Sequence, residues 1–198
     1  MSANRRPTDH FAKRAKKENF PARSVYKLKE IDDKVHLIRR GDKVLDLGAA
    51  PGSWTLYAAE KVGPQGMVVA VDQQRLNTGT GANVHAIEAD VMTVDIATVT
   101  APLEGVLLDA VISDMAPWTS GHRFVDQARS FHLFMRALEI AEQTLRAGGR
   151  FAGKIFQGED FEAARGAVRE LFQTAKIVRP KSVRSESYEI YLVGLNRR

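Results

Sequence analysis

Four charged side chains lie where the sequence pattern predicts an apolar environment or the end of a strand. Lys154 interrupts the apolar run FAGKIFQG, and Glu189 alternates with packing residues in SYEIYLVG. Asp114 closes LDAVISD just before a proline-fixed loop, and Lys27 lies beside the apolar stripe of an expected helix. Lysines and carboxylates at one cleft are the side-chain types of acid–base chemistry. A buried lysine needs a partner, so pairing of Lys154 with Glu189 would satisfy both, although a snorkelling or structurally salt-bridged lysine is the alternative.

A glycine-rich turn in DLGAAPGSW forms a second candidate site. Gly48 and Gly52 let the backbone turn tightly, and a helix that begins near Ser53 or Trp54 would direct amide hydrogens toward a ligand. The sequence has no G-x-G-x-x-G fingerprint and no G-K-[ST] motif, which makes dinucleotide and phosphate-loop sites poor explanations.

Two aspartates complete this second site. Asp72 ends one expected strand, where it could accept hydrogen bonds from ribose hydroxyls, and Asp90 ends the next, where a nucleoside base could lie. Either aspartate alone could equally be a turn cap. Together with the glycine turn, they favour a cofactor that contains a nucleoside.

The elements that must position these residues alternate between strand and helix patterns. Ser24 is expected to cap a helix with Val25, Leu28 and Ile31 on one face. Strands are expected at 43–48, 66–72, 83–90, 108–114 and 150–158, helices at 53–63, 125–145 (stopped by Gly148-Gly149) and 161–174, and two strands at the end. This alternation predicts an α/β fold with a mostly parallel sheet and helices on both faces.

Composition limits the class of protein. A length of 198 residues fits one domain. With no cysteine and five scattered histidines, we expect no disulfide and no metal site. No apolar run is long enough to span a membrane, and the N-terminus lacks a signal-peptide pattern, which predicts a cytoplasmic protein.

The net charge of +5 is unevenly distributed. Residues 1–43 hold 13 Lys/Arg against 6 Asp/Glu, residues 44–175 hold 10 against 16, and residues 176–198 hold 6 against 2. Such basic ends can neutralise phosphates, although for a charge run alone a solvated, soluble surface is the better explanation.

The motifs DLGAAPGSW, SDMAP with its following SG, GKIFQG and SYEIYLV, preceded by RSVYKLKEI, resemble the FtsJ, or RrmJ, ribosomal RNA 2′-O-methyltransferases. The resemblance runs from about Thr8 to the end of the chain. It implies a Rossmann-like, S-adenosylmethionine-dependent methyltransferase fold: a seven-stranded sheet with its last strand antiparallel, in a single domain spanning 1–198, with 1–23 as a basic RNA-binding arm or short helix. The implied activity is methylation of a uridine ribose in 23S ribosomal RNA, with the RNA or the large (50S) subunit as partner and a monomeric enzyme.

The resemblance also assigns residues, motif by motif. The catalytic group of the family falls on Lys27, Asp114, Lys154 and Glu189, and its cofactor-binding residues fall on Gly52, Trp54, Asp72, Asp90 and Asp114. We take Lys154 as the base, Asp114 and Glu189 as its orienting partners, and Lys27 as the group that tunes it. Lysine is a base only when neutral, a form that burial and a second positive charge favour and that carboxylates oppose.

Two segments depart from the family pattern. Trp118 stands where the family has asparagine, and it could stack on an RNA base or pack the loop. The segment from Leu76 to Asn83 also matches poorly. Alternative functions are an RNA-binding assembly factor that has lost the chemistry, which the complete catalytic group disfavours, and a 2′-O-methyltransferase of transfer RNA. A methyltransferase of base nitrogens would be expected to carry a different loop after the fourth strand.

Overall fold

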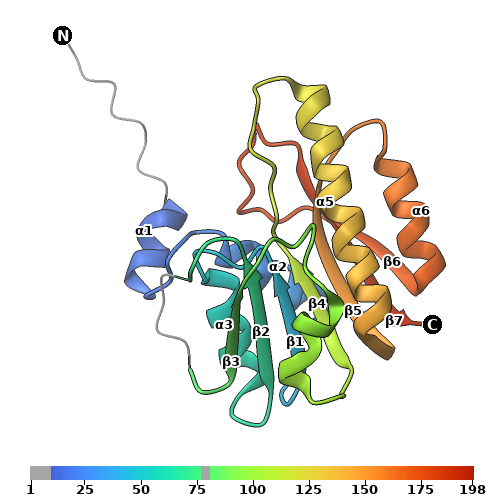
Figure 1. Ribbon diagram of the computed structural model, residues 1–198. Helices are drawn as coiled ribbons and strands as arrows, with labels where there is room; N and C mark the ends of the chain where they lie inside the picture. The colour runs from blue at the N-terminus through green and yellow to red at the C-terminus, as the bar shows by residue number, and fades with distance from the viewer. Residues whose placement is uncertain (1–9, 77–80) are drawn as a thin grey trace.

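A computed structural model describes residues 10–76 and 81–198 (Figure 1). Residues 1–9 of the expected basic arm, and residues 77–80 of the poorly matching segment, lie outside the described residues. The helices and strands are α1 (His10–Lys17), α2 (Val25–Val35), β1 (Lys43–Leu47), α3 (Ser53–Val62), β2 (Met67–Asp72), β3 (Val84–Glu88), α4 (Ile96–Thr100), the short 3₁₀ helix η1 (Ala101–Leu103), β4 (Leu108–Ser113), α5 (Arg123–Thr144), β5 (Leu145–Phe156), α6 (Phe161–Leu171), β6 (Phe172–Val178) and β7 (Glu189–Arg197).

The strands form a seven-stranded sheet in the order β3-β2-β1-β4-β5-β7-β6. The pairs from β3 through β5 are parallel, whereas β7 inserts between β5 and β6 and runs antiparallel to both. This confirms the expected seven-stranded, mostly parallel sheet with an antiparallel last strand. Because parallel strands end at the same edge, the loops after β1, β2, β3 and β4 gather at that edge, where ligands bind in open α/β sheets.

Each face of the sheet is covered by its own helices (Figure 1). On one face α4, α5 and α6 pack against strand residues such as Val111 and Ile155, and on the other α1, α2 and α3 pack against residues such as Ala152. Side chains alternate between the two faces along a strand. Lys154 therefore projects to the same side as Ala152, which is the side of α2. In β7 the same alternation places Glu189 and Tyr191 on the α2 side.

Three expectations from the sequence need correction. Helix α5 ends at Thr144, within one residue of the expected Leu145, but strand β5 begins at Leu145 and not at the expected Arg150, because Leu145 is extended (φ −73°, ψ 141°) and pairs with β4. Gly148 and Gly149 consequently lie inside β5, where the pairing with β4 is irregular.

The other two corrections concern α6 and α2. Helix α6 ends at Leu171, before the expected Thr174, since the buried Phe172 begins the strand β6. Ser24 precedes α2 as expected, but its side chain makes no capping hydrogen bond.

Within the described parts of the chain, no helix is long and apolar enough to cross a membrane. A search of the same residues finds no group of three or more His, Cys, Asp or Glu side chains that could hold a metal ion.

Candidate active site

The turn after β1 is held against the end of β2. The backbone N–H groups of Gly48 and Ala49 donate to the carbonyl of Val71 at 2.9 and 3.2 Å, and the N–H of Ala50 donates to the carboxylate of Asp72 at 3.0 Å. Gly48 has φ +75°, and a Cβ there would lie 2.5 Å from the side chain of Met115. Glycine is therefore required here both for the backbone conformation and for the close approach of the loop after β4.

A cavity of about 410 Å³ opens at the carboxyl ends of the strands. We call it the Asp72 cavity. Three of the predicted cofactor-binding residues, Asp72, Asp90 and Asp114, line it. Apolar atoms of Val91, Met92, Met115, Pro117 and Leu133 form much of the remaining wall. A cavity with apolar walls and a few carboxylates suits a nucleoside, whose base is apolar on its faces and whose ribose donates hydrogen bonds.

The other two predicted cofactor-binding residues do not line this cavity. Gly52 precedes α3 with φ +108°. Trp54 is only 3% exposed; its indole N–H donates to the carbonyl of Ser24 at 2.9 Å, and its ring lies 5.8 Å from that of Tyr191. The Trp54 side chain therefore packs between α2 and β7. Only its backbone N–H, in the first turn of α3, could face a ligand, since such groups lack helical partners.

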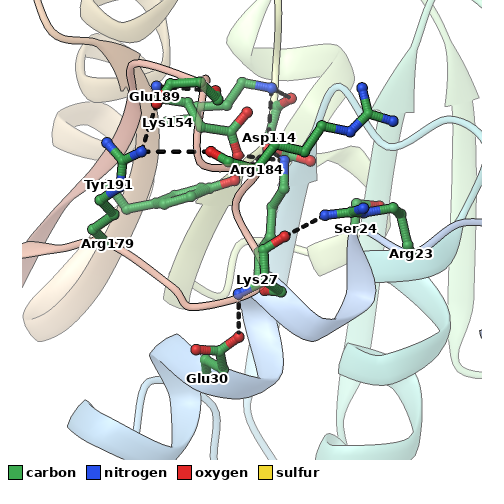
Figure 2. Close-up of polar contacts among 12 residues, drawn as sticks. Arg23, Ser24, Lys27, Glu30, Asp114, Lys154, Arg179, Arg184, Glu189 and Tyr191 are labelled. Carbon is green, nitrogen blue, oxygen red and sulfur yellow. Dashed lines mark hydrogen bonds and ion pairs between the residues drawn. The ribbon is translucent and has the colours of Figure 1, made fainter. Parts of the chain in front are cut away.

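The four predicted catalytic residues come together from four different elements (Figure 2). Lys27 lies on α2, Asp114 directly follows β4, Lys154 lies on β5 and Glu189 begins β7. The Lys154 ammonium is 3.0 Å from Asp114 Oδ1 and also donates to the Asp114 carbonyl. The Lys27 ammonium is 2.5 Å from Glu189 Oε1 and 3.9 Å from Asp114 Oδ1. The expected pair of Lys154 with Glu189 is thus wrong: each lysine takes a different carboxylate.

Burial distinguishes these side chains. The Lys154 side chain is 5% exposed, against 14–15% for the other three. Lys154 is therefore the innermost of the group, and solvent reaches the ion pair of Lys27 and Glu189 more easily.

Asp114 is held ionised by its neighbours. Its burial opposes the charge, but Lys154, then Lys27, and the hydroxyl of Tyr191 together outweigh burial, so the pKa of Asp114 lies below its usual value. The Tyr191 hydroxyl donates to Asp114 Oδ1 at 2.6 Å. Burial, reinforced by the charges of Asp114 and Glu189, raises the pKa of Tyr191 well above its usual value, so this hydroxyl remains a donor.

Sequence reasoning missed this role of Tyr191. The signal that could have identified it is the alternation in SYEIYLVG, which puts Tyr191 on the same face of the strand as Glu189.

A second cavity, of about 600 Å³, lies on the other side of the catalytic group. We call it the Tyr188 cavity. Lys27 and Glu189 line it, whereas Asp114 lines the Asp72 cavity. Because Lys27 and Asp114 are within 3.9 Å of each other, the two cavities meet at the catalytic group. A further cavity, of about 630 Å³, lies near Lys43 and Met67 at the opposite edge of the sheet, away from all four catalytic candidates.

Trp118 is presented to solvent on the loop after β4. It is 86% exposed, which does not support the interpretation that it packs the loop, and it lies at the rim of the Asp72 cavity. Its loop is nevertheless held: Arg129 donates to the Trp118 carbonyl at 3.1 Å, and the backbone N–H and hydroxyl of Ser120 donate to Asp126 at 2.7 and 2.8 Å.

Comparisons with known proteins agree with this geometry. The chain is 48% identical over 190 residues to ribosomal RNA large subunit methyltransferase E of Sorangium cellulosum, covering 96% of this chain and 88% of that protein. It is 51% identical over 187 residues to the protein of the same name from Oleidesulfovibrio alaskensis, covering 94% and 90%.

A crystal structure from Plasmodium falciparum, described as that of a ribosomal RNA methyltransferase, is 25% identical and superposes with a TM-score of 0.80 over 90% of this chain and 98% of that one. The FtsJ-like methyltransferase family matches residues 20–197. With its sheet, its glycine turn and its four gathered charges, the chain belongs to the FtsJ-like methyltransferase family.

Proposed function

We propose that this enzyme transfers a methyl group to the ribose 2′-hydroxyl of a uridine in the 23S RNA of the large ribosomal subunit, and that it does so in the cytoplasm. The observation that carries the proposal is the buried Lys154 paired with Asp114, because Asp114 lines one cavity and its neighbour Lys27 lines another. The curated relatives, named for ribosomal RNA of the large subunit, support the choice of RNA.

As a member of its family, the enzyme uses S-adenosylmethionine, which supplies a methyl group on a positively charged sulfur. The Asp72 cavity fits the nucleoside part of this cofactor, because its volume of about 410 Å³ is bounded by apolar side chains and by carboxylates that can accept hydrogen bonds. In our proposal Asp72 accepts hydrogen bonds from the ribose and Asp90 from the adenine. Gly52 leaves space for the backbone of the turn, the Trp54 N–H contacts the amino-acid part, and Asp114 attracts the positive charge.

The remaining steps belong to the protein's own side chains. A ribose hydroxyl is a weak nucleophile, so a base must remove its proton as it attacks the methyl group in line with the departing sulfur. We assign this role to Lys154, which must first release one ammonium proton to water so that the neutral Nζ can accept the proton of the hydroxyl. Asp114 fixes the position of Nζ, since it accepts from it through both its carboxylate and its carbonyl. Lys27, held by Glu189, contributes a positive charge beside the acceptor oxygen.

The test is methylation of large subunits isolated without the modification, with radiolabelled S-adenosylmethionine. Wild type is compared with Lys154→Ala and with the control Lys176→Ala, which removes an exposed lysine from β6. We expect a 2′-O-methyl group in large-subunit RNA with wild type and the control, and no label with Lys154→Ala, although calorimetry should show that it still binds the cofactor. Equal labelling in all three proteins would refute the assignment of Lys154.

No label with wild type, despite cofactor binding, would refute the substrate. A labelled transfer RNA would then identify the other 2′-O-methyltransferase function, and labelling of neither RNA would favour an assembly factor.

A further inference from the structure

The Tyr188 cavity and the proposed site of the methyl donor adjoin different residues of the catalytic group. In-line transfer requires the attacking oxygen to approach the methyl group from the side opposite the sulfur. The proposed donor occupies the Asp72 cavity, on the Asp114 side of the catalytic group, whereas the Tyr188 cavity opens on the Lys27 and Glu189 side. A molecule in the Tyr188 cavity would therefore meet the catalytic group at Lys27 and Glu189, and a donor in the Asp72 cavity would meet it at Asp114, which contacts both Lys27 and Lys154.

The charges of this cavity suit one phosphodiester. Arg23, Lys27 and Arg184 line it together with two carboxylates, Glu186 and Glu189. Glu189 is paired with Lys27, and Glu186 accepts a hydrogen bond from the Ser185 hydroxyl at 3.0 Å. Three cations thus face two anions.

The two arginines lie close enough to affect each other. After burial, the charge of Arg184 is the largest cause that lowers the pKa of Arg23. The carboxylates of Glu189 and Glu186 act on Arg23 in the opposite direction, and a bound phosphate would add to their effect. Figure 2 shows both arginines beside the group formed by Lys27 and Asp114.

An aromatic pair forms another wall. The rings of Tyr188 and Phe156 both line the cavity, with their centroids 4.8 Å apart in an edge-to-face arrangement. The Arg123 guanidinium lies 5.4 Å from the Tyr188 ring centroid and supports it from the start of α5. Aromatic and arginine planes are the surfaces on which proteins receive unpaired RNA bases.

Hydrogen bonds within the protein hold the wall of the Tyr188 cavity in place. The Glu30 carboxylate accepts from the backbone N–H groups of Lys181 and Ser182 at 2.6 and 2.9 Å, which ties the loop between β6 and β7 to α2. Arg179 donates to the Ser187 carbonyl at 2.6 Å and Arg23 donates to the Ser182 carbonyl, which closes the loop further. Because Glu30 and Lys27 both lie on α2, this helix positions the wall of the cavity and the Lys27 ammonium together.

We infer that the Tyr188 cavity binds the acceptor ribonucleotide, turned out of its RNA, with Arg23 and Arg184 contacting its phosphates and the Tyr188–Phe156 pair enclosing its base. This inference rests on the proposed function, since it names where the substrate of that reaction lies. It commits to single-stranded RNA because cations and aromatic rings line the same cavity.

The test compares Arg184→Ala with Arg169→Ala, which removes the same charge from the exposed face of α6, outside the cavity. The Arg184 side chain is exposed, so its loss should not impair folding. KM for undermethylated large subunits is measured over a range of salt concentrations. For Arg184→Ala we expect a KM about tenfold higher, with unchanged affinity for S-adenosylmethionine. The slope of log KM against log salt concentration should fall by about 1, which corresponds to the loss of one phosphate contact. Arg184→Lys should recover part of the loss.

A second pair of variants examines the aromatic wall. Tyr188→Phe keeps the ring and should retain the wild-type KM, whereas Tyr188→Ala should raise it about tenfold, which corresponds to the loss of one base contact. If Arg184→Ala and Arg169→Ala share one KM and one salt dependence, the cavity assignment is wrong while the proposed function stands. If wild type transfers no methyl group to the subunit, the proposed function itself fails.

Discussion

Asp46 in β1 is a buried carboxylate whose titration should be visible in the stability of the fold. It is fully buried, and its Oδ2 accepts from the Thr55 hydroxyl at 2.7 Å, while its Oδ1 has no hydrogen-bond partner among the described residues. Burial raises the pKa of Asp46 to about 7, from an ordinary value of 3.8, and the charges of Asp114 and Asp72 add to the shift. A carboxylate that prefers to be neutral in the folded state makes that state less stable as the pH rises.

The size of the effect follows from linkage. Between pH 3.8 and about 7 the folded chain holds a proton at Asp46 that the unfolded chain has released, so the free energy of unfolding falls with increasing pH. A shift of about 3 units corresponds to about 4 kcal/mol in total, of which about 2.5 kcal/mol should be lost between pH 5 and pH 8. Above pH 8 the loss is complete, and below pH 3.8 it is absent.

The variant Asp46→Asn removes this titration while its amide oxygen can still accept from Thr55. Urea unfolding of both proteins at pH 5, 6, 7 and 8 should show the variant gaining about 2.5 kcal/mol on wild type across the series, whatever its offset at pH 5. The control is Asp126→Asn. The backbone N–H of Ser120, and then its hydroxyl, lower the pKa of Asp126, so its stabilising effect is complete above pH 5 and its difference from wild type should be constant. A constant difference for Asp46→Asn as well would refute the reasoning.

Two further variants test the site. Tyr191→Phe removes the hydroxyl that donates to Asp114, and this loss should raise the pKa of the Asp114 carboxyl. The acidic limb of the pH profile of kcat/KM should therefore move to higher pH. An unmoved limb would mean that Asp114 need not be ionised. Trp118→Ala should raise KM for the large subunit about fivefold through loss of a stacked base, without changing the affinity for S-adenosylmethionine measured by calorimetry; the reverse pattern would assign Trp118 to the cofactor cavity.

Local pattern was sufficient to predict most of the sheet. Four expected strands coincide with β1 to β4 to within two residues, and the fifth matches the second half of β5, because short apolar runs closed by turn residues have few other structures available. The start of β5 was expected five residues too late, at Arg150, since the glycines at 148 and 149 resemble the end of a helix but are also tolerated in an irregular strand. What decided the boundary was the tertiary pairing of Leu145 with Leu108, which helix propensity does not contain.

The site was predictable as a set of residues but not as a set of contacts. Alternation places Glu189 among packing residues, and an interrupted apolar run marks Lys154, so each residue could be identified from its own strand. Which carboxylate each lysine meets depends on register. Lys154 lies opposite Tyr191, two residues along β5 from Phe156, which pairs with Glu189, and Lys154 follows the residue that pairs with Ser113 at the end of β4. The Trp54 side chain shows the same limit, because only the packing of α2 against β7 reveals that it is enclosed between them.

The observed pairing changes how variants of the site must be interpreted. Lys27 and Glu189 are 2.5 Å apart although they lie near opposite ends of the chain, and Glu30 fixes the loop before β7 to the helix that carries Lys27. Loss of Lys27 therefore leaves Glu189 without this ion pair at the mouth of the Tyr188 cavity, whereas loss of Lys154 leaves Asp114 still in contact with Lys27 and with the Tyr191 hydroxyl. A loss of activity in a Lys154 variant therefore reports directly on the proton acceptor. A loss of activity in a Lys27 variant also includes the effect of displacing the wall of the Tyr188 cavity.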